Sequence, residues 1–88
     1  MTEALSAWDA TIHVEHPDPS RVKWLSRSLA PEAAREVPRA RAELLPGKDG
    51  SLDVRIVAQD SVALRAALNT YLGWIHLSLA TADAANRP

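Results

Sequence analysis

Apolar and polar residues alternate over three short segments of the chain, 8–14, 36–45 and 52–58. Alternation with a period of two is typical of a strand that buries one face. The apolar side chains that point the same way are Trp8, Ala10, Ile12 and Val14 in the first segment, Ala40, Ala42 and Leu44 in the second, and Leu52, Val54, Ile56 and Ala58 in the third. Pro38 cannot donate a ladder hydrogen bond, so the second strand is predicted to begin near it or to lie at a sheet edge.

A short helix is predicted to follow the first strand after a break at "HPDPS", residues 16–20. Asp18 is a suitable N-cap, and Pro19 suits the first helical position. The helix is predicted to run to about Leu29, with Trp24 on the side opposite its apolar stripe. The stripe consists of Val22, Leu25 and Leu29. The string "APEAAREVP" that follows is predicted to form a second short turn or a loop.

A longer helix is predicted over about 61–82, with Asp60 or Ser61 as its N-cap. "PGKDG", residues 46–50, is predicted to be a hairpin turn between the second and third strands. The element order is therefore β-α-β-β-α, an α+β fold. We expect a three-stranded antiparallel sheet in the order 1-3-2, with both helices on one face. Residues 1–88 are predicted to form a single domain that is ordered over about 7–83.

Apolar residues cover more of the long helix than one core needs. The stripe predicted to cover the sheet consists of Leu64, Leu68, Leu72, Ile75 and Leu79. A polar strip on one flank consists of Arg65, Asn69 and His76. The residues on the far side, named here the small-residue seam, are Ala66, Thr70, Gly73, Leu77 and Ala80, and they repeat at heptad spacing.

Two interpretations of the small-residue seam are open. Gly73 costs about 1 kcal/mol relative to Ala in a helix interior, and the close crossing of another helix would explain its presence. That second helix belongs either to a partner protein or to the same domain, in which case the first helix packs on the seam. Trp24 favours a partner, because large aromatic residues commonly anchor interfaces.

Composition limits the classes of function. The chain has 88 residues and no Cys, which excludes disulfides and thiolate metal sites. Its net charge is −1, whereas a protein that holds nucleic acid by itself is usually basic. "MTEALSAWDA" has neither the basic nor the apolar region of a signal peptide, and no apolar run reaches the roughly 18–20 residues of a membrane span. We therefore expect a cytoplasmic protein without a membrane contact.

No group of residues matches a catalytic or metal-binding motif. His13, His16 and His76 fall on different predicted elements, and the sequence has no P-loop and no nucleophile motif. We expect no catalytic residue, no metal and no cofactor. "GKDG", residues 47–50, matches the G-x-x-G of KH domains, but there the loop joins two helices, whereas here it is predicted to join two strands.

Three arginines are candidates for a contact with RNA. Arg39, Arg41 and Arg55 are predicted to share the outer face of the sheet. The alternative is a solvated face balanced by Glu43 and Asp53, which the near-neutral charge favours.

Residues 58–75, "AQDSVALRAALNTYLGWI", resemble the signature of the CTAG/Pcc family, the small dimerising Pcc-type subunit of the KEOPS (EKC) complex in its short archaeal form. The residues that carry the likeness are Ala58 and Asp60, then Leu64, Arg65 and Ala66, then Asn69 and Thr70 followed by Tyr71 and Leu72. "RSLAPE", residues 27–32, is similar to the family's Leu-x-Pro-Glu helix end. Element order and length agree over nearly the whole chain. The departures are Gly73, where a longer and often basic residue is usual, and Pro38.

The resemblance implies a non-enzymatic role. KEOPS makes the threonylcarbamoyl modification of the adenosine beside the anticodon in certain tRNAs, through a transferase subunit that works with a kinase-like ATPase subunit. The Pcc-type subunit is implied to be a homodimer that binds the transferase through its helices and supports tRNA binding. The predicted partner-binding residues are Trp24, Ala66, Thr70, Gly73 and Leu77, and the residues of the structural motif are Asp60, Leu64, Arg65 and Asn69, with Asn69 bonded to a loop carbonyl. A stand-alone KH-like RNA-binding module and a small enzyme are the competing hypotheses.

Overall fold

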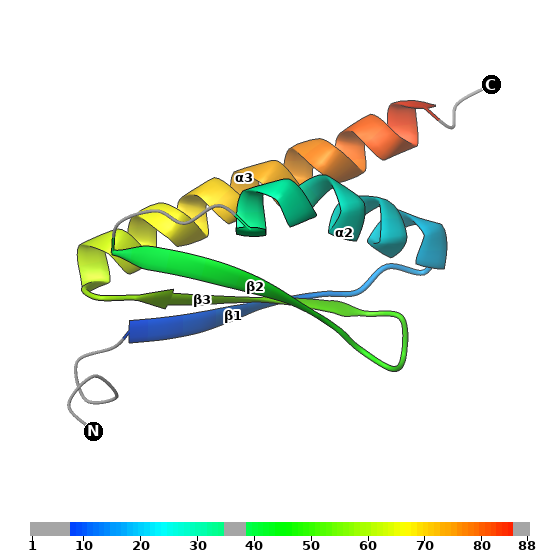
Figure 1. Ribbon diagram of the computed structural model, residues 1–88. Helices are drawn as coiled ribbons and strands as arrows, with labels where there is room; N and C mark the ends of the chain where they lie inside the picture. The colour runs from blue at the N-terminus through cyan, green and yellow to red at the C-terminus, as the bar shows by residue number, and fades with distance from the viewer. Residues whose placement is uncertain (1–7, 35–38, 86–88) are drawn as a thin grey trace.

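The computed structural model describes residues 8–34 and 39–85, which form one layer of sheet and one layer of helix (Figure 1). The elements are β1 (Trp8–Val14), α2 (Pro19–Ala34), β2 (Ala40–Pro46), β3 (Leu52–Ala58) and α3 (Ser61–Ala85). The sheet is antiparallel with the strand order β1-β3-β2, and both helices lie on the same side of it (Figure 1). The predicted fold class, element order and strand order are confirmed.

The last strand in the sequence, β3, lies at the centre of the sheet, since β1 and β2 both pair with it. Ala10 and Ala42 flank Ile56, and Ile12 and Leu44 flank Val54. These rows face the helices, and β3 is the most completely buried strand. The predicted alternation of each strand is confirmed except at Trp8, which lies at the end of the sheet and is half exposed.

The hairpin between β2 and β3 is built by the "GKDG" residues, as predicted. Gly50 has a φ of +84°, a conformation that favours Gly, and the Gly47 N–H donates to the carbonyl of Ser51. The carboxylate of Asp49 accepts hydrogen bonds from the backbone N–H and the hydroxyl of Ser51. The G-x-x-G match is therefore turn chemistry between strands.

Helix α2 is one turn longer than predicted and runs through Pro31 to Ala34. Proline removes only the hydrogen bond to the carbonyl four residues earlier, that of Arg27, and Arg27 lies on the exposed side of the helix. At the other end, a carboxylate oxygen of Asp18 accepts the backbone N–H of Ser20 and so caps the helix as predicted. Strand β2 begins at Ala40, and Pro38 lies outside the described residues.

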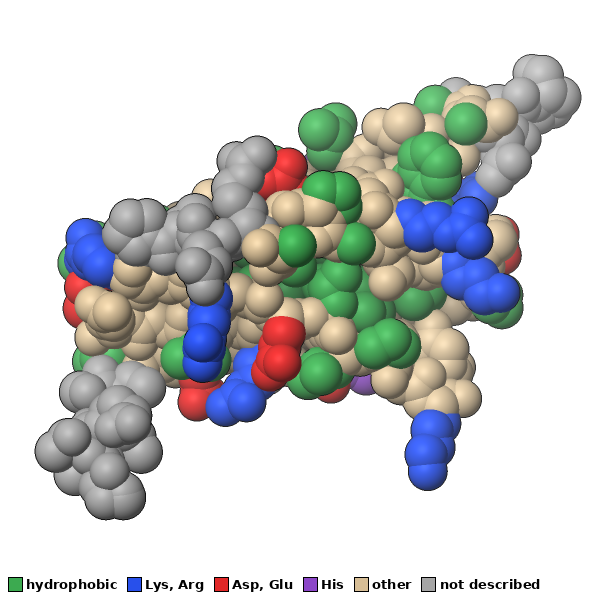
Figure 2. All heavy atoms as spheres, viewed as in Figure 1, with side chains coloured by type: hydrophobic (Ala, Val, Ile, Leu, Met, Phe, Trp, Pro, Cys, Tyr) green, Lys and Arg blue, Asp and Glu red, His purple; other side chains and the backbone are tan. Residues whose placement is uncertain are grey.

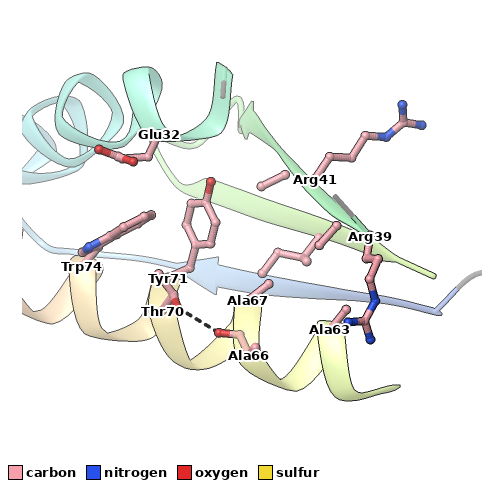
Figure 3. A pocket seen from close by; sticks show the side chains of 12 residues that line it. Glu32, Arg39, Arg41, Ala63, Ala66, Ala67, Thr70, Tyr71 and Trp74 are labelled. Carbon is pink, nitrogen blue, oxygen red and sulfur yellow. Dashed lines mark hydrogen bonds between the residues drawn. The ribbon is translucent and has the colours of Figure 1, made fainter. Parts of the chain in front are cut away.

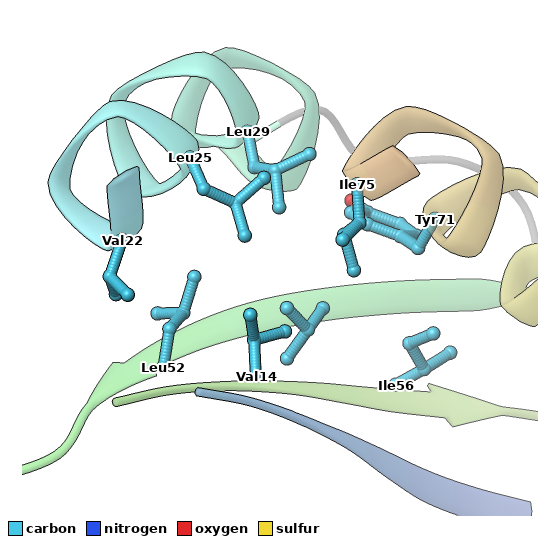
Figure 4. Close-up of a cluster of buried hydrophobic side chains, with 9 residues drawn as sticks. Val14, Val22, Leu25, Leu29, Leu52, Ile56, Tyr71 and Ile75 are labelled. Carbon is cyan, nitrogen blue, oxygen red and sulfur yellow. The ribbon is translucent and has the colours of Figure 1, made fainter. Parts of the chain in front are cut away.

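The core lies where α2, α3 and the sheet meet, and not beneath α3 alone (Figure 4). Its members are Val14, Val22, Leu25, Leu29, Leu52, Val54, Ile56, Tyr71 and Ile75. The predicted leucine stripe of α3 was wrong at Leu72, which is 49% exposed, whereas Tyr71 is buried. The reason is that α2 packs along one side of α3, so the buried face of α3 turns toward Tyr71 and away from Leu72.

Candidate partner-binding surfaces

The small-residue seam of α3 faces solvent along its whole length. Its five residues are exposed, and Leu77 retains 63% of its accessible surface. A Cβ added at Gly73 would have no heavy atom within 4 Å. The interpretation in which the first helix of the same domain packs on the seam was therefore wrong, and nothing inside the described chain accounts for Gly73.

Trp24 joins the two helices at the border of this exposed surface. Its indole Nε1 donates a hydrogen bond of 3.0 Å to the backbone carbonyl of Ser78 in α3. The side chain is still 43% exposed. An aromatic ring that is held at one edge and open on its face loses little conformational freedom when a partner covers it.

A groove of about 330 Å³ opens between β2 and α3, close to the end of α2 (Figure 3). The described residues that line it are Glu32, Arg39, Ala40, Arg41, Ala42, Ile56, Ala63, Ala66, Ala67, Thr70, Tyr71 and Trp74. Two seam residues, Ala66 and Thr70, thus form one wall, and the Thr70 hydroxyl donates to the Ala66 carbonyl at 2.9 Å (Figure 3). Tyr71 and Trp74 meet edge to face, with ring centroids 5.1 Å apart. The groove is mostly apolar, and its charged groups stand at its rim.

Asp60 connects the start of α3 to the start of β2. Its Oδ1 accepts the backbone N–H of Ala63 at 2.7 Å, the geometry of an N-cap, and its Oδ2 accepts two hydrogen bonds from the guanidinium of Arg39. The hydrogen bond from Ala63, followed by that from Arg39, lowers the pKa of the Asp60 carboxyl. Arg39 has a φ of +77°, which is unfavourable for a residue with a Cβ, and its guanidinium is bound by Asp60.

The other residues of the predicted structural motif do not share one environment. Leu64 packs partly buried against the core, whereas Arg65 and Asn69 are exposed. The side chain of Asn69 makes no hydrogen bond within the described residues, so the predicted bond to a loop carbonyl is absent there.

The prediction that the three candidate arginines share one face was wrong for Arg39, whereas Arg41 and Arg55 both fall on the outer side of the strand alternation. Arg39 precedes the first residue of β2, has a left-handed φ and pairs with Asp60 at the start of α3. Arg55 lies on the outer sheet face, the side of the sheet away from the helices, between carboxylates of Asp9 and Glu43 at 3.6 and 3.7 Å. Arg41 alone has no ion-pair partner among the described residues.

A histidine lies between two carboxylates on the same outer sheet face. The Nδ1 of His13 is 2.5 Å from an oxygen of Asp53, and its Nε2 is 2.8 Å from an oxygen of Glu15. The hydrogen bond to Asp53, together with that to Glu15, raises the pKa of His13 above its ordinary value. The charges of His13 and Arg55 on this face are thus compensated locally.

Sequence reasoning missed two cations on α2. Lys23 and Arg27 are four residues apart on its exposed side and have no ion-pair partner in the described part of the chain. The signal was the i, i+4 spacing itself, which places both on one face opposite the apolar stripe. Residues 8–34 and 39–85 contain no group of three or more potential metal ligands, and no described helix combines the length and apolarity of a membrane crossing.

The described residues thus form a small α+β domain that exposes apolar helix surface, which is typical of an interaction module. The model of the family described as "Transcription factor Pcc1" matches residues 9–83, and the chain belongs to this family. The family is a non-catalytic one and implies a KEOPS-associated subunit. A search of curated proteins returned no match.

Proposed function

We propose that the chain is a non-catalytic dimerisation and scaffold subunit of KEOPS, the complex that makes the threonylcarbamoyl-adenosine modification of tRNA. The observation that carries the proposal is the exposed small-residue seam of α3, in which Leu77 is 63% exposed and a Cβ added at Gly73 would meet no heavy atom within 4 Å. The chain binds the transferase subunit through its helices, with the small-residue seam as the contact surface. The kinase-like ATPase subunit associates with the chain only indirectly. The site of action is the cytoplasm.

The homodimer forms along β1. This strand pairs with β3 on one side, and the other side of it has no partner strand in the described chain. Next to this edge the leucine flank of α3 is incompletely buried, with Leu72 half exposed and Leu68 and Leu79 partly so. An unpaired edge beside an apolar surface favours the addition of a strand from a second copy.

Support of tRNA binding is a property of the assembled complex in this proposal. Arg39 and Arg55 are already paired with carboxylates, so Arg41 is the one of the three candidate arginines without a partner. One unpaired arginine among the three candidates, on a chain with a net charge of −1, gives little support for holding RNA alone. The stand-alone KH-like module is therefore the weaker candidate.

The test is assembly with the purified transferase subunit, followed by gel filtration with light scattering. We expect the wild-type chain to elute as a dimer and to form a stable complex with the transferase. Leu77→Asp should abolish the complex, because it places a charge at the centre of an apolar interface. Leu45→Asp is the matched control, since Leu45 is 43% exposed on the outer sheet face.

Failure of the wild-type chain to bind the transferase would contradict the scaffold role. Tight binding of single-stranded RNA by the isolated chain would favour the KH-like alternative. A monomer that persists at micromolar concentration would contradict only the homodimer and would leave the scaffold role open.

A further inference from the structure

The edge of the sheet opposite β1 is formed by β2, which has β3 as its only neighbouring strand in the described chain. Just before β2, the carbonyl of Arg39 accepts a hydrogen bond from the backbone N–H of Gln59, so its backbone points toward β3. Backbone groups of a paired strand point alternately to the two sides, and the register is unbroken along β2. The residues whose N–H and C=O groups point to the open edge are therefore Ala40, Ala42 and Leu44.

The side chains of the same three residues face the helix layer. Ala40 and Ala42 line the groove between β2 and α3, and Leu44 packs partly buried against the core. The opposite wall carries small side chains at Ala63 and Ala66, which leave the groove open. Figure 2 shows hydrophobic side chains exposed between the helix layer and β2. Free backbone groups and open apolar space thus lie side by side.

Arg41 adds a charge between the two alanines. It is exposed, its side chain points away from α3 (Figure 3), and it has no ion-pair partner within residues 8–34 and 39–85. In a strand added to β2, the residue opposite Arg41 would form a pair without backbone hydrogen bonds, in which side chains lie closest. A carboxylate at that position is complementary to the guanidinium. The residues before and after the carboxylate would point into the groove, because side chains alternate along a strand.

A second copy of the chain is the weaker candidate for this edge. In the proposed homodimer the copies already pair along β1, so pairing of further copies along β2 would extend the sheet into an open assembly. A closed dimer leaves β2 for a different chain. This step rests on the proposed homodimer, whereas the geometry of the edge and of the groove does not.

We propose that the edge of β2 and the adjacent groove bind an extended segment of a partner protein by strand addition. The segment carries an acidic residue between two aliphatic residues. Its backbone pairs with Ala40, Ala42 and Leu44, its aliphatic side chains fill the groove, and its carboxylate meets Arg41. Main-chain hydrogen bonds supply affinity in this mode of recognition, and alternate side chains supply specificity. Pro46 has no N–H and ends the usable edge at the hairpin.

The probe is the blocked peptide Thr-Thr-Val-Glu-Val-Thr-Thr, which reads the same in both directions and so tests parallel and antiparallel pairing together. It is titrated into the full chain, with ¹⁵N labelling, and amide signals are followed by NMR. We expect the largest shifts and slower hydrogen exchange at Ala40, Ala42 and Leu44. A second peptide with Lys in place of Glu should bind more weakly.

Two variants test the backbone and the groove separately. Ala42→Pro removes an outward N–H without removing a hydrogen bond to β3, and it should weaken peptide binding at least tenfold. Ala63→Leu fills the groove, leaves β2 unchanged and should also weaken binding, so the proposal stays testable if the proline variant does not fold. Its matched control is Ala84→Leu, at an exposed position near the end of α3. Thermal melts establish which variants are folded.

Charge reversal tests the contact with Arg41. Arg41→Glu should weaken binding of the Glu peptide by about three- to tenfold and strengthen binding of the Lys peptide by a similar factor. Lys48→Glu makes the same change of charge at the hairpin and should alter both affinities less than twofold.

Shifts confined to β1 or to the small-residue seam would overturn the inference, as would equal effects of Arg41→Glu and Lys48→Glu. Assemblies larger than a dimer that disappear in Ala42→Pro would overturn it as well and would assign the edge to further copies of the chain. Light scattering separates this result from the proposed function. A monomer that binds the peptide would contradict only the homodimer, and a dimer that does not bind it would contradict only the strand addition.

Discussion

The two faces of this small domain differ in whether their exposed side chains have partners within the domain. On the outer sheet face, Arg55 lies between two carboxylates and His13 lies between two more. On the helix face, Leu77 is 63% exposed and a Cβ added at Gly73 would meet no heavy atom within 4 Å. Lys23 and Arg27 of α2 have no ion-pair partner among the described residues. Charges that are compensated internally offer little to a partner. Apolar and cationic groups that are left uncompensated are the ones that a partner can satisfy.

The largest expected effect is the difference in unfolding free energy lost when a buried leucine or an exposed leucine is replaced by alanine. Leu25 has no accessible surface and packs in the core, so Leu25→Ala should cost about 2–5 kcal/mol of unfolding free energy. Leu77→Ala should stay within about 0.5 kcal/mol, because the side chain is mostly in water. Denaturant unfolding of both variants measures the difference. Similar losses for the two would mean that Leu77 is covered in the folded chain or its dimer.

The second prediction tests whether the helix face is an interface. Gly73→Leu should keep or raise the melting temperature, since Leu is the better helix former and nothing lies within 4 Å of the added Cβ. Its bulk should weaken transferase binding by about 1–3 kcal/mol. Calorimetric titration beside a thermal melt measures both. Thr11→Leu places a leucine on the outer sheet face instead and should bind normally. Unchanged affinity for Gly73→Leu would move the interface toward Trp24 and α2.

A third and smaller effect concerns Asp60, which ties the sheet to the helix layer. Asp60→Ala should lower the melting temperature by a few degrees through loss of the cap, whereas Asp60→Asn keeps an acceptor for Ala63 and should lose less. The folded state depresses the pKa of Asp60 below its ordinary 3.8, so its contribution is present above that pH and disappears as the pH falls through the folded pKa.

The measurement for Asp60 is the difference in melting temperature between wild type and Asp60→Ala from pH 7 down to pH 2. The difference should narrow in acid. A gap that stays constant would show that the ionised carboxylate is not the stabilising species. If Asp60→Ala melts normally but removes tRNA modification in a reconstituted complex, the structural role fails.

The smallest expected effect is a pH-dependent change in melting temperature caused by His13 on the outer sheet face. Both ring nitrogens of His13 face carboxylates, an arrangement that requires the protonated ring to donate at both. The folded pKa is raised above 6.5, so this contribution is full below pH 6.5 and is lost as the pH rises through the folded pKa. Wild type should therefore exceed His13→Gln in melting temperature at pH 5.5 and match it at pH 9. His76→Gln, at an exposed position of α3, is the matched substitution away from these carboxylates.

The sequence was a good guide to the strands and a poorer one to the helix faces, for a physical reason. A strand has two faces, so alternation alone identified the buried side of β3. A helix can bury any part of its circumference, and the face that α3 buries depends on where α2 lies, which placed Tyr71 inside and left Leu72 half exposed. The position of Arg39 could not be predicted from the pattern either, because it combines a left-handed φ with a contact to Asp60 that is 21 residues away in the sequence.

The central place of β3 has a consequence for the chain as it leaves the ribosome. Strand β1 is synthesised first, yet its only described partner, β3, follows after α2 and β2. We therefore expect the nascent chain to expose β1 until the hairpin of β2 and β3 has emerged, since non-local pairing is slow to form. Exposed strands of this kind are targets for chaperones and for pairing between neighbouring nascent chains on one polysome. The same delay gives two nascent copies an opportunity to join along β1 before either is released.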